Sequence, residues 1–266
     1  EVNILVKKGY KDFSFVSQDS SSYLRDLGHN DGLEQLIDAV EKIDGVKTAR
    51  ILYLYPSTTT LNLIDKIADS KVFVNYFDMP LQHISQNMLK IMKRGKGAEK
   101  LIELMNYMKS KPNSFVRTTF IAGHPGESEE DFEELCSFVE EFGFDRGNVF
   151  SYSDEEGTSA ETRDDKIEQE LIDERAEILG DIISQTTIKS LENDIGKSFE
   201  VYIDGESEEH EYLLSARKTI WAPEIDGEIY INDNEGNLPI VFGEIYEVEA
   251  TQLAGDKLLA KIIRKV

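Results

Sequence analysis

Residues 117–127, with the sequence RTTFIAGHPGE, contain the residue types best suited to binding a ligand. A β-prone run ends in a turn that holds Gly123, Pro125 and Gly126, and acidic residues typical of a helix start follow it. Open α/β sheets and barrels bind their ligands at the carboxyl ends of strands, and glycine lets the backbone approach a ligand closely. The pattern therefore indicates a strand-to-helix loop that contacts a nucleotide-like ligand. An ordinary Gly-Pro turn is the alternative.

Polar side chains also follow other predicted strands. Gln18 and Asp19 come after the first strand, Asp78 and Gln82 lie around the end of the third, and Tyr152 follows the last. Amide, carboxylate and phenol groups can hydrogen-bond a ribose, an amino-acid head group or an adenine edge. The two aspartates are also candidate general bases, although solvated carboxylates are the more common case.

The single cysteine, Cys136, lies at helical spacing with Phe132, Leu135 and Val139 on one apolar face. This pattern favours a core thiol over a metal ligand or a nucleophile. The four histidines are scattered, and no cysteine or histidine pair has the spacing of a metal site. The sequence thus predicts neither a disulfide nor a metal site within these residues.

Residues 1–165 alternate between strand and helix patterns. The order implies a parallel sheet with right-handed crossovers. Residues 1–8 are typical of the end of a helix, so we expect further chain, including a sixth strand, before Glu1. The predicted strands are 13–17, 49–55, 72–79, 115–121 and 147–152, and the predicted helices are 32–43, 60–68, 86–92, 98–109 and 131–142.

The last hundred residues follow a different pattern. Residues 166–196 predict one long connecting helix that ends at Gly196. From residue 197 to residue 266 the apolar period changes to two, with turn residues between short runs. Several short strands within one small segment predict a β-barrel.

The composition is strongly acidic, with 52 Asp and Glu against 29 Lys and Arg and a net charge of −23. Such a charge argues against a surface that neutralises phosphates and favours a basic protein as partner. No apolar run is long enough to span a membrane, and the first residues are not typical of a signal peptide. We therefore expect a cytoplasmic protein.

Taken together, the motifs at the strand ends resemble those of the radical S-adenosylmethionine (SAM) methylthiotransferases over nearly the whole chain. The resemblance implies an α/β fold, a partial (β/α) TIM-like barrel over residues 1–165. A connecting helix (166–196) and a small all-β, OB-like TRAM barrel (197–266) that binds the target would follow. The motifs are FSFVSQDSSSY, RILYLYPS, YFDMPLQHIS, MKRG, VRTTFIAGHPGESEEDF and FDRGNVFSYSDEEGTSA.

Two segments, DMPLQH at 78–83 and APEIDG at 222–227, resemble the branch that modifies an aspartate of a small-subunit ribosomal protein. The alternative branch modifies an adenosine of tRNA. Residues 197–266 contain 15 acidic and 7 basic residues, a net charge of −8. A negative barrel repels RNA phosphates and attracts a basic ribosomal protein, so we expect no direct contact with nucleic acid. The electron donor cannot be identified from the sequence.

The resemblance implies SAM and two [4Fe-4S] clusters as cofactors, and a methylthio group added to the β-carbon of the aspartate. Such clusters are held by cysteine thiolates. The family's C-x-x-x-C-x-x-C loop and its three further cysteines are absent from these 266 residues. We therefore expect this chain alone to be inactive. A scaffold that has lost its clusters is the remaining alternative.

The resemblance also assigns roles to strand-end residues. Gln18 and Asp19 would bind the amino-acid head of SAM, while Asp78 and Gln82 would line the ribose or the substrate channel. Arg117 would pair with a carboxylate, or would be a structural ion-pair partner.

The remaining assignments concern the adenine and the target. Phe150 and Tyr152 would flank the adenine, next to the backbone of the turn at 123–126. In the second domain, Trp221 and Pro223 would contact the target protein, because aromatic anchors are common at interfaces. A core tryptophan is the alternative.

Overall fold

The structure, a computed structural model, describes residues 1–95, 97–234 and 236–266. The chain forms two compact units, Glu1–Thr186 and Thr187–Val266. Each unit has its own sheet, and each is described separately below.

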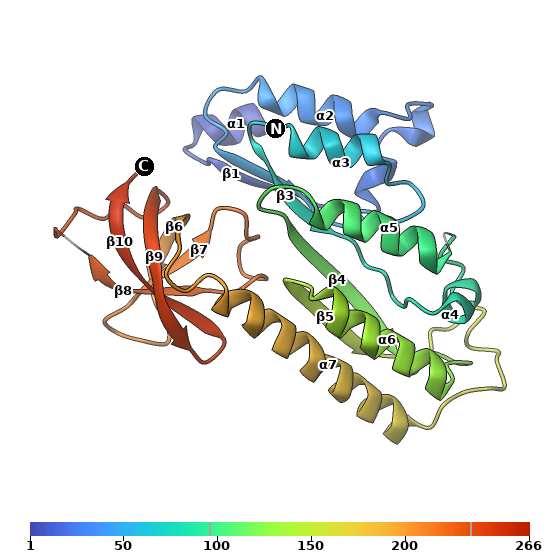
Figure 1. Ribbon diagram of the computed structural model, residues 1–266. Helices are drawn as coiled ribbons and strands as arrows, with labels where there is room; N and C mark the ends of the chain where they lie inside the picture. The colour runs from blue at the N-terminus through green and yellow to red at the C-terminus, as the bar shows by residue number, and fades with distance from the viewer. Residues whose placement is uncertain (96, 235) are drawn as a thin grey trace. The chain divides into compact units, whose positions relative to one another are not determined.

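The first unit contains a five-stranded sheet in which every strand is parallel to its neighbours, in the order β1-β2-β3-β4-β5 (Figure 1). Since every strand runs parallel to its neighbours, all five carboxyl ends lie at one edge of the sheet. This arrangement confirms the predicted partial barrel. The strands are β1 (Asp12–Phe15), β2 (Thr48–Ile51), β3 (Phe73–Asp78), β4 (Phe115–Ala122) and β5 (Arg146–Ser151).

Helices connect these strands, and α2, α3, α5 and α6 lie along one face of the sheet (Figure 1). Their apolar sides form a single core with the strands, in which Ile37, Ile64, Leu101 and Leu135 are fully buried. The helices are α1 (Val2–Lys7), α2 (Gly32–Glu41), α3 (Leu61–Ala68), α4 (Gln86–Ile91), α5 (Ala98–Lys109) and α6 (Glu129–Phe142), with short 3-10 helices at Ser20–Ser22 and Arg25–Leu27.

Side-chain caps set where three of these helices begin. The hydroxyl of Thr60 accepts a hydrogen bond from the first turn of α3, and that of Ser85 does the same for α4. Ser128 and Asp131 form a capping box at the start of α6, in which each side chain accepts from the other residue's backbone N–H. These caps fix the helix starts just after the loops that surround the sheet edge.

Strand β2 ends at Ile51, before the predicted end at residue 55. The prediction was wrong there because Tyr53 adopts a left-handed backbone conformation, with φ of 58°. Its N–H donates to the Asp78 carboxylate at 3.1 Å instead of to a neighbouring strand. The chain beyond Ile51 is therefore an irregular segment at the sheet edge.

Helix α7 (Gln169–Glu192) begins in the first unit and packs there on the sheet. Ile172, Leu179 and Ile183 are buried along it. A Cβ atom at Gly147 would lie 3.1 Å from Ile183, so this helix approaches the backbone of β5 closely.

The second unit is a closed barrel with the strand order β10-β8-β7-β6-β9, which confirms the predicted small β-barrel. Strands β10 and β8 pair in parallel, and the other pairs are antiparallel. Its core holds alternate residues such as Val201, Ile203, Val248 and Ile262. The strands are β6 (Ser198–Glu206), β7 (Leu214–Lys218), β8 (Ile229–Asn234), β9 (Ile245–Ala254) and β10 (Lys257–Lys265).

Among the residues that the structure describes, no helix is long and apolar enough to cross a membrane.

Candidate functional site

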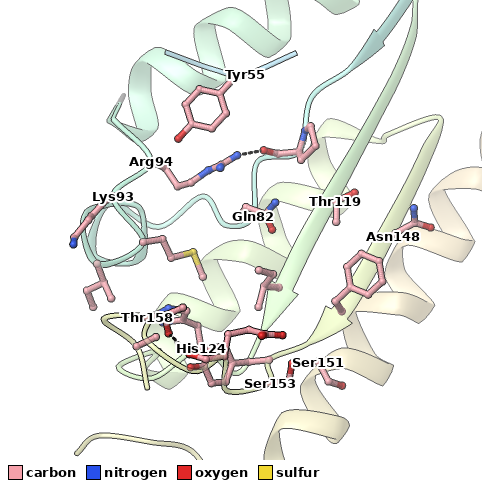
Figure 2. Close-up of a pocket in the computed structure, with 18 of the residues that line it drawn as sticks. Tyr55, Gln82, Lys93, Arg94, Thr119, His124, Asn148, Ser151, Ser153 and Thr158 are labelled. Carbon is pink, nitrogen blue, oxygen red and sulfur yellow. Dashed lines mark hydrogen bonds between the residues drawn. The ribbon is translucent and has the colours of Figure 1, made fainter. Parts of the chain in front are cut away.

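A cavity of about 800 Å³ opens at the carboxyl ends of the strands in the first unit (Figure 2). This volume is typical of sites for small molecules and cofactors. Residues from the ends of all five strands and from the loops after them line it. Among these residues are Gln18, Tyr53, Tyr55, Pro80, Gln82, Arg94, Arg117, Thr119, His124, Asn148, Phe150 and Tyr152.

The structure brings five of the predicted site residues together on this lining: Gln18, Gln82, Arg117, Phe150 and Tyr152. Phe150 is well exposed, with 59% of its surface accessible, so its ring is available to a ligand. Five other predicted residues lie beside the cavity and do not line it. They are Asp19, Asp78, Gly123, Pro125 and Gly126.

Asp19 organises the loop after β1. Its Oδ1 accepts from the backbone N–H of Ser22 at 3.1 Å and from the Ser21 hydroxyl at 2.7 Å. The carboxylate thereby caps the short helix Ser20–Ser22. A contact between Asp19 and a ligand's amino group stays a prediction.

Asp78 and Arg117 form an ion pair beneath the cavity, with 3.1 Å between Oδ1 and Nη1. The Asp78 side chain is fully buried, and its Oδ2 accepts from the backbone N–H of Tyr53. Burial raises the pKa of Asp78, and the attraction of Arg117 and the Tyr53 hydrogen bond only partly oppose this effect. The Asn148 amide is oriented so that its nitrogen donates to the Gly147 carbonyl and its oxygen accepts from Arg117 Nη2 at 2.8 Å. These contacts fix the Arg117 guanidinium across three adjacent strands.

Gln82 supplies a hydrogen-bond acceptor to the cavity. Its backbone pairs with β4, donating to the Thr119 carbonyl and accepting from the Ile121 N–H, each at 2.9 Å. Its side-chain Oε1 is buried and has no hydrogen-bond partner among the described residues. A buried acceptor without a donor is unfavourable, so this atom is suited to a ligand hydroxyl or amino group.

The turn after β4 depends on its two glycines. Gly123 has φ of 80°, and a Cβ there would lie 2.5 Å from Ile172 of α7. Gly126 has φ of 88°, and its N–H donates to the Asp165 carbonyl at 3.1 Å. Other residues would be strained at these backbone angles, and a side chain at position 123 would also clash with α7.

A buried charge network supports this turn from behind. Glu127 Oε1 pairs with Arg175 of α7 at 2.8 Å, and Oε2 accepts from the Gly123 N–H at 3.0 Å. His83 Nδ1 accepts from the N–H groups of Ile84 and Ser85, which places the ring proton on Nε2. That nitrogen lies 3.6 Å from Glu127 Oε2.

Sequence reasoning missed this network. The sequence pattern predicts Glu127 only as part of an acidic helix start, and it assigns no role to Arg175. The acidic residue just after the Gly-Pro-Gly turn was the available signal. Its arginine partner could not be found, because 48 residues separate Glu127 from Arg175.

His124 is a further lining residue that sequence reasoning did not select. Its Nδ1 lies 2.9 Å from the Pro125 carbonyl, to which it must donate, so Nε2 is the acceptor atom of the ring. The ring meets Tyr152 edge-on, with 5.0 Å between centroids. Burial lowers the pKa of His124, which favours the neutral ring.

In the second unit, the two predicted contact residues differ in exposure. Trp221, in the segment between β7 and β8, is buried with 1% of its surface exposed, whereas Pro223 is exposed. Arg217 donates to the Trp221 carbonyl at 3.2 Å. A contact between these residues and a target protein stays a prediction.

The first unit is a parallel half-barrel with a cofactor-sized cavity at its strand ends, and the second is a closed β-barrel. These features define a two-domain α/β protein that binds a ligand. Residues 1–139 match the Radical SAM superfamily, and residues 195–263 match the TRAM domain. The chain belongs to the radical SAM superfamily.

Several curated relatives carry the printed name "Ribosomal protein uS12 methylthiotransferase RimO". The chain is 78% identical to the one from Aliarcobacter butzleri and 60% identical to the one from Sulfurovum sp., over 99% and 100% of its length. It is 55% identical to the one from Campylobacter jejuni over its full length. The chain spans about 60% of the length of these relatives.

Among solved structures, coproporphyrinogen III oxidase (HemN) from Escherichia coli superposes with a TM-score of 0.46 at 19% identity. The match covers 62% of this chain and 37% of that one. SuiB from Streptococcus suis, bound to S-adenosylmethionine, superposes with a TM-score of 0.43 at 19% identity, covering 65% and 35%.

The superfamily implies SAM and an iron–sulfur cluster, and the residues of this chain fit these two groups differently. The cavity volume and the buried Gln82 Oε1 suit an adenosyl ligand. The one cysteine, Cys136, lies on α6, away from the cavity lining. Burial and nearby carboxylates raise the pKa of its thiol to about 11. The described residues contain no group of three or more potential metal ligands, so they do not fit the cluster.

Proposed function

We propose that this chain is the SAM-binding and target-binding part of an enzyme that adds a methylthio group to the β-carbon of an aspartate in ribosomal protein uS12. The identity to proteins named uS12 methylthiotransferases, 78% over 99% of this chain in one case, carries this proposal. The position of the cavity at the strand ends supports it.

We place SAM in the cavity. Gln82 Oε1 would accept from a ribose hydroxyl, and Phe150 and Tyr152 would flank the adenine. The amino-acid head would lie toward Gln18 and Asp19 at the end of β1. SAM, when bound there, supplies the adenosyl and methyl groups that the reaction uses.

The other assigned residues position these contacts. The ion pair of Asp78 with Arg117 would keep a guanidinium directed at the ligand. The glycines and Pro125 of the turn would hold its backbone close to the adenine. The clusters, two of them in this proposal, would be held by cysteines of the full-length protein outside these 266 residues.

The functional division would follow the predicted one. Residues 1–165 would bind SAM, residues 166–196 would connect, and residues 197–266 would bind uS12, with Pro223 and the segment around Trp221 at the contact. The net charge of −8 on the last segment suits a basic protein and opposes contact with nucleic acid. We place the enzyme in the cytoplasm, where ribosomes are available.

The test uses the full-length protein with its clusters reconstituted under anaerobic conditions, together with SAM, a reductant and sulfide as the source of the added sulfur atom. Purified uS12 and tRNA are offered in parallel, and both are analysed by mass spectrometry. We expect uS12 to gain the mass of one methylthio group in place of one hydrogen on a single aspartate. Modification of tRNA with unchanged uS12 would contradict the proposal. The 266-residue chain, treated identically, should form no stable cluster and leave both substrates unchanged.

A further inference from the structure

Arg94 follows helix α4 and lines the cavity, and two residues, Tyr55 and Pro80, contact its guanidinium. The Cζ atom lies over the Tyr55 ring, 4.6 Å from its centroid, and Nη2 donates to the Pro80 carbonyl (Figure 2). The backbone N–H of Arg94 donates to the Leu89 carbonyl at 2.9 Å, which ties the residue to the last turn of α4. The side chain is therefore fixed at the cavity and is not a freely moving surface cation.

Among the described residues, Arg94 has no carboxylate partner, in contrast to the buried arginines of this protein. Within residues 1–95, 97–234 and 236–266, no acidic side chain forms an ion pair with it, and its buried Nε has no hydrogen-bond partner. Burial lowers the pKa of Arg94, and only Tyr55 counters this among the causes identified. Four buried arginines each have a carboxylate within 3.1 Å, in the pairs Arg50–Asp12, Arg117–Asp78, Arg175–Glu127 and Arg217–Asp204.

A shortage of acidic residues cannot explain this difference, because the chain has 52 of them against 29 basic residues. A half-buried guanidinium is unfavourable without an anion, and its planar fork matches a carboxylate through parallel hydrogen bonds. The site is open toward the cavity, so the missing anion can come from a ligand.

We propose that Arg94 binds a carboxylate of a molecule that enters this cavity. The inference rests on the proposed function, which offers two sources of that group. One is the methionyl carboxylate of SAM, and the other is the side chain of the target aspartate. Arg94 would then make the part of the cavity between Tyr55 and Pro80 selective for a carboxylate, and would thereby orient the ligand that carries it.

The test measures binding by calorimetry with the full-length, cluster-reconstituted protein. The ligands form two matched pairs: SAM with decarboxylated SAM, and a uS12 peptide containing the target aspartate with the same peptide containing asparagine. The variants are Arg94→Gln, Arg94→Lys and, as a charge-matched control, Lys90→Gln on the exposed side of α4. Circular dichroism and thermal unfolding of each variant show whether the fold is kept.

Arg94→Gln should weaken binding of the carboxylate-bearing member of one pair by about ten- to a hundred-fold, and leave its carboxylate-free partner unchanged. The affected pair identifies the source of the carboxylate. Arg94→Lys should recover part of the loss, and Lys90→Gln should have no effect.

Two results would overturn the inference while leaving the proposed function intact. Either Arg94→Gln binds every ligand as the wild type does, or it loses affinity equally for both members of each pair, as a purely structural role requires. If the wild type itself bound neither SAM nor the aspartate peptide, the proposed function would fail and the inference would fail with it.

Discussion

Asp78, the last residue of β3, and Arg117, which pairs with it on β4, are joined by a 3.1 Å ion pair, yet burial still raises the pKa of Asp78 above its ordinary value of 3.8. The cost of removing the carboxylate from water therefore outweighs the attraction of its arginine. The pair is better explained by its position than by stability, because it holds Arg117 at the cavity and Tyr53 in its left-handed conformation.

The raised pKa fixes the sign of a pH effect. When the pKa of a carboxyl group is higher in the folded than in the unfolded state, its protonated form stabilises the fold. This stabilisation is complete at pH values below the unfolded-state pKa and is lost as pH rises through the folded-state pKa. Asp78→Asn removes the titration. We expect the stability of the wild type relative to Asp78→Asn to fall as pH rises above the ordinary pKa of 3.8 and through the folded-state pKa, measured by urea unfolding at several pH values. A relative stability that rises with pH, as for an exposed ion pair, would contradict this account.

Arg175 pairs with two carboxylates that differ in burial, which permits a matched comparison. Glu127 is fully buried, at 2.8 Å, whereas Glu129 is 65% exposed, at 2.9 Å. Glu127→Gln turns an amide N–H₂ toward the donors of Gly123 or Arg175 and should lower the free energy of unfolding by about 3–5 kcal/mol. Glu129→Gln should lower it by less than about 1 kcal/mol. Equal losses in denaturant unfolding would show that burial does not govern this network.

Gly123 and Gly157 share a φ of 80° but differ in the space around them. A Cβ at Gly123 meets Ile172 at 2.5 Å, and one at Gly157 meets no described residue within 4 Å. Gly157→Ala should cost about 1–2 kcal/mol from backbone strain alone. Gly123→Ala adds about 1–3 kcal/mol of overpacking against α7. If thermal unfolding showed the same loss for both variants, the close packing of α7 on the turn would be disproved.

Phe150 offers an exposed ring to the cavity, and base–aromatic stacking contributes about 1–3 kcal/mol per base. Phe150→Ala in the full-length protein should therefore weaken SAM binding by about five- to a hundred-fold in calorimetry. The control is Tyr212→Ala, which removes an 89% exposed ring in the second unit. If Phe150→Ala bound SAM with unchanged affinity, or if both variants lost affinity equally, the Phe150 ring would not be part of the proposed adenine site.

Much of the fold was predictable because its signals are local. The apolar periods around Phe120, Leu135 and Val201 gave the parallel sheet, the helices and the small barrel. The early end of β2 was not predictable, because the conformation of Tyr53 depends on a carboxylate 25 residues later. Strand β7 (Leu214–Lys218) was not assigned, since its few residues have no clear alternation.

The site was predictable at the level of strand ends and less so for individual partners. Gln82 and Phe150 could be proposed because polar and aromatic residues after strands meet at one edge of a parallel sheet. Arg94 could not, because its importance follows from its having no ion-pair partner in the described part of the chain, and a sequence does not reveal ion pairing.

The central claim, that the carboxyl ends of β3, β4 and β5 form the SAM site, is tested most directly by hydrogen exchange. The reconstituted full-length protein would be compared with and without SAM, with exchange followed by mass spectrometry. We predict slower exchange on SAM binding in residues 80–94, 117–126 and 148–152. Unchanged exchange in these segments, or protection confined to residues 197–266, would contradict the account.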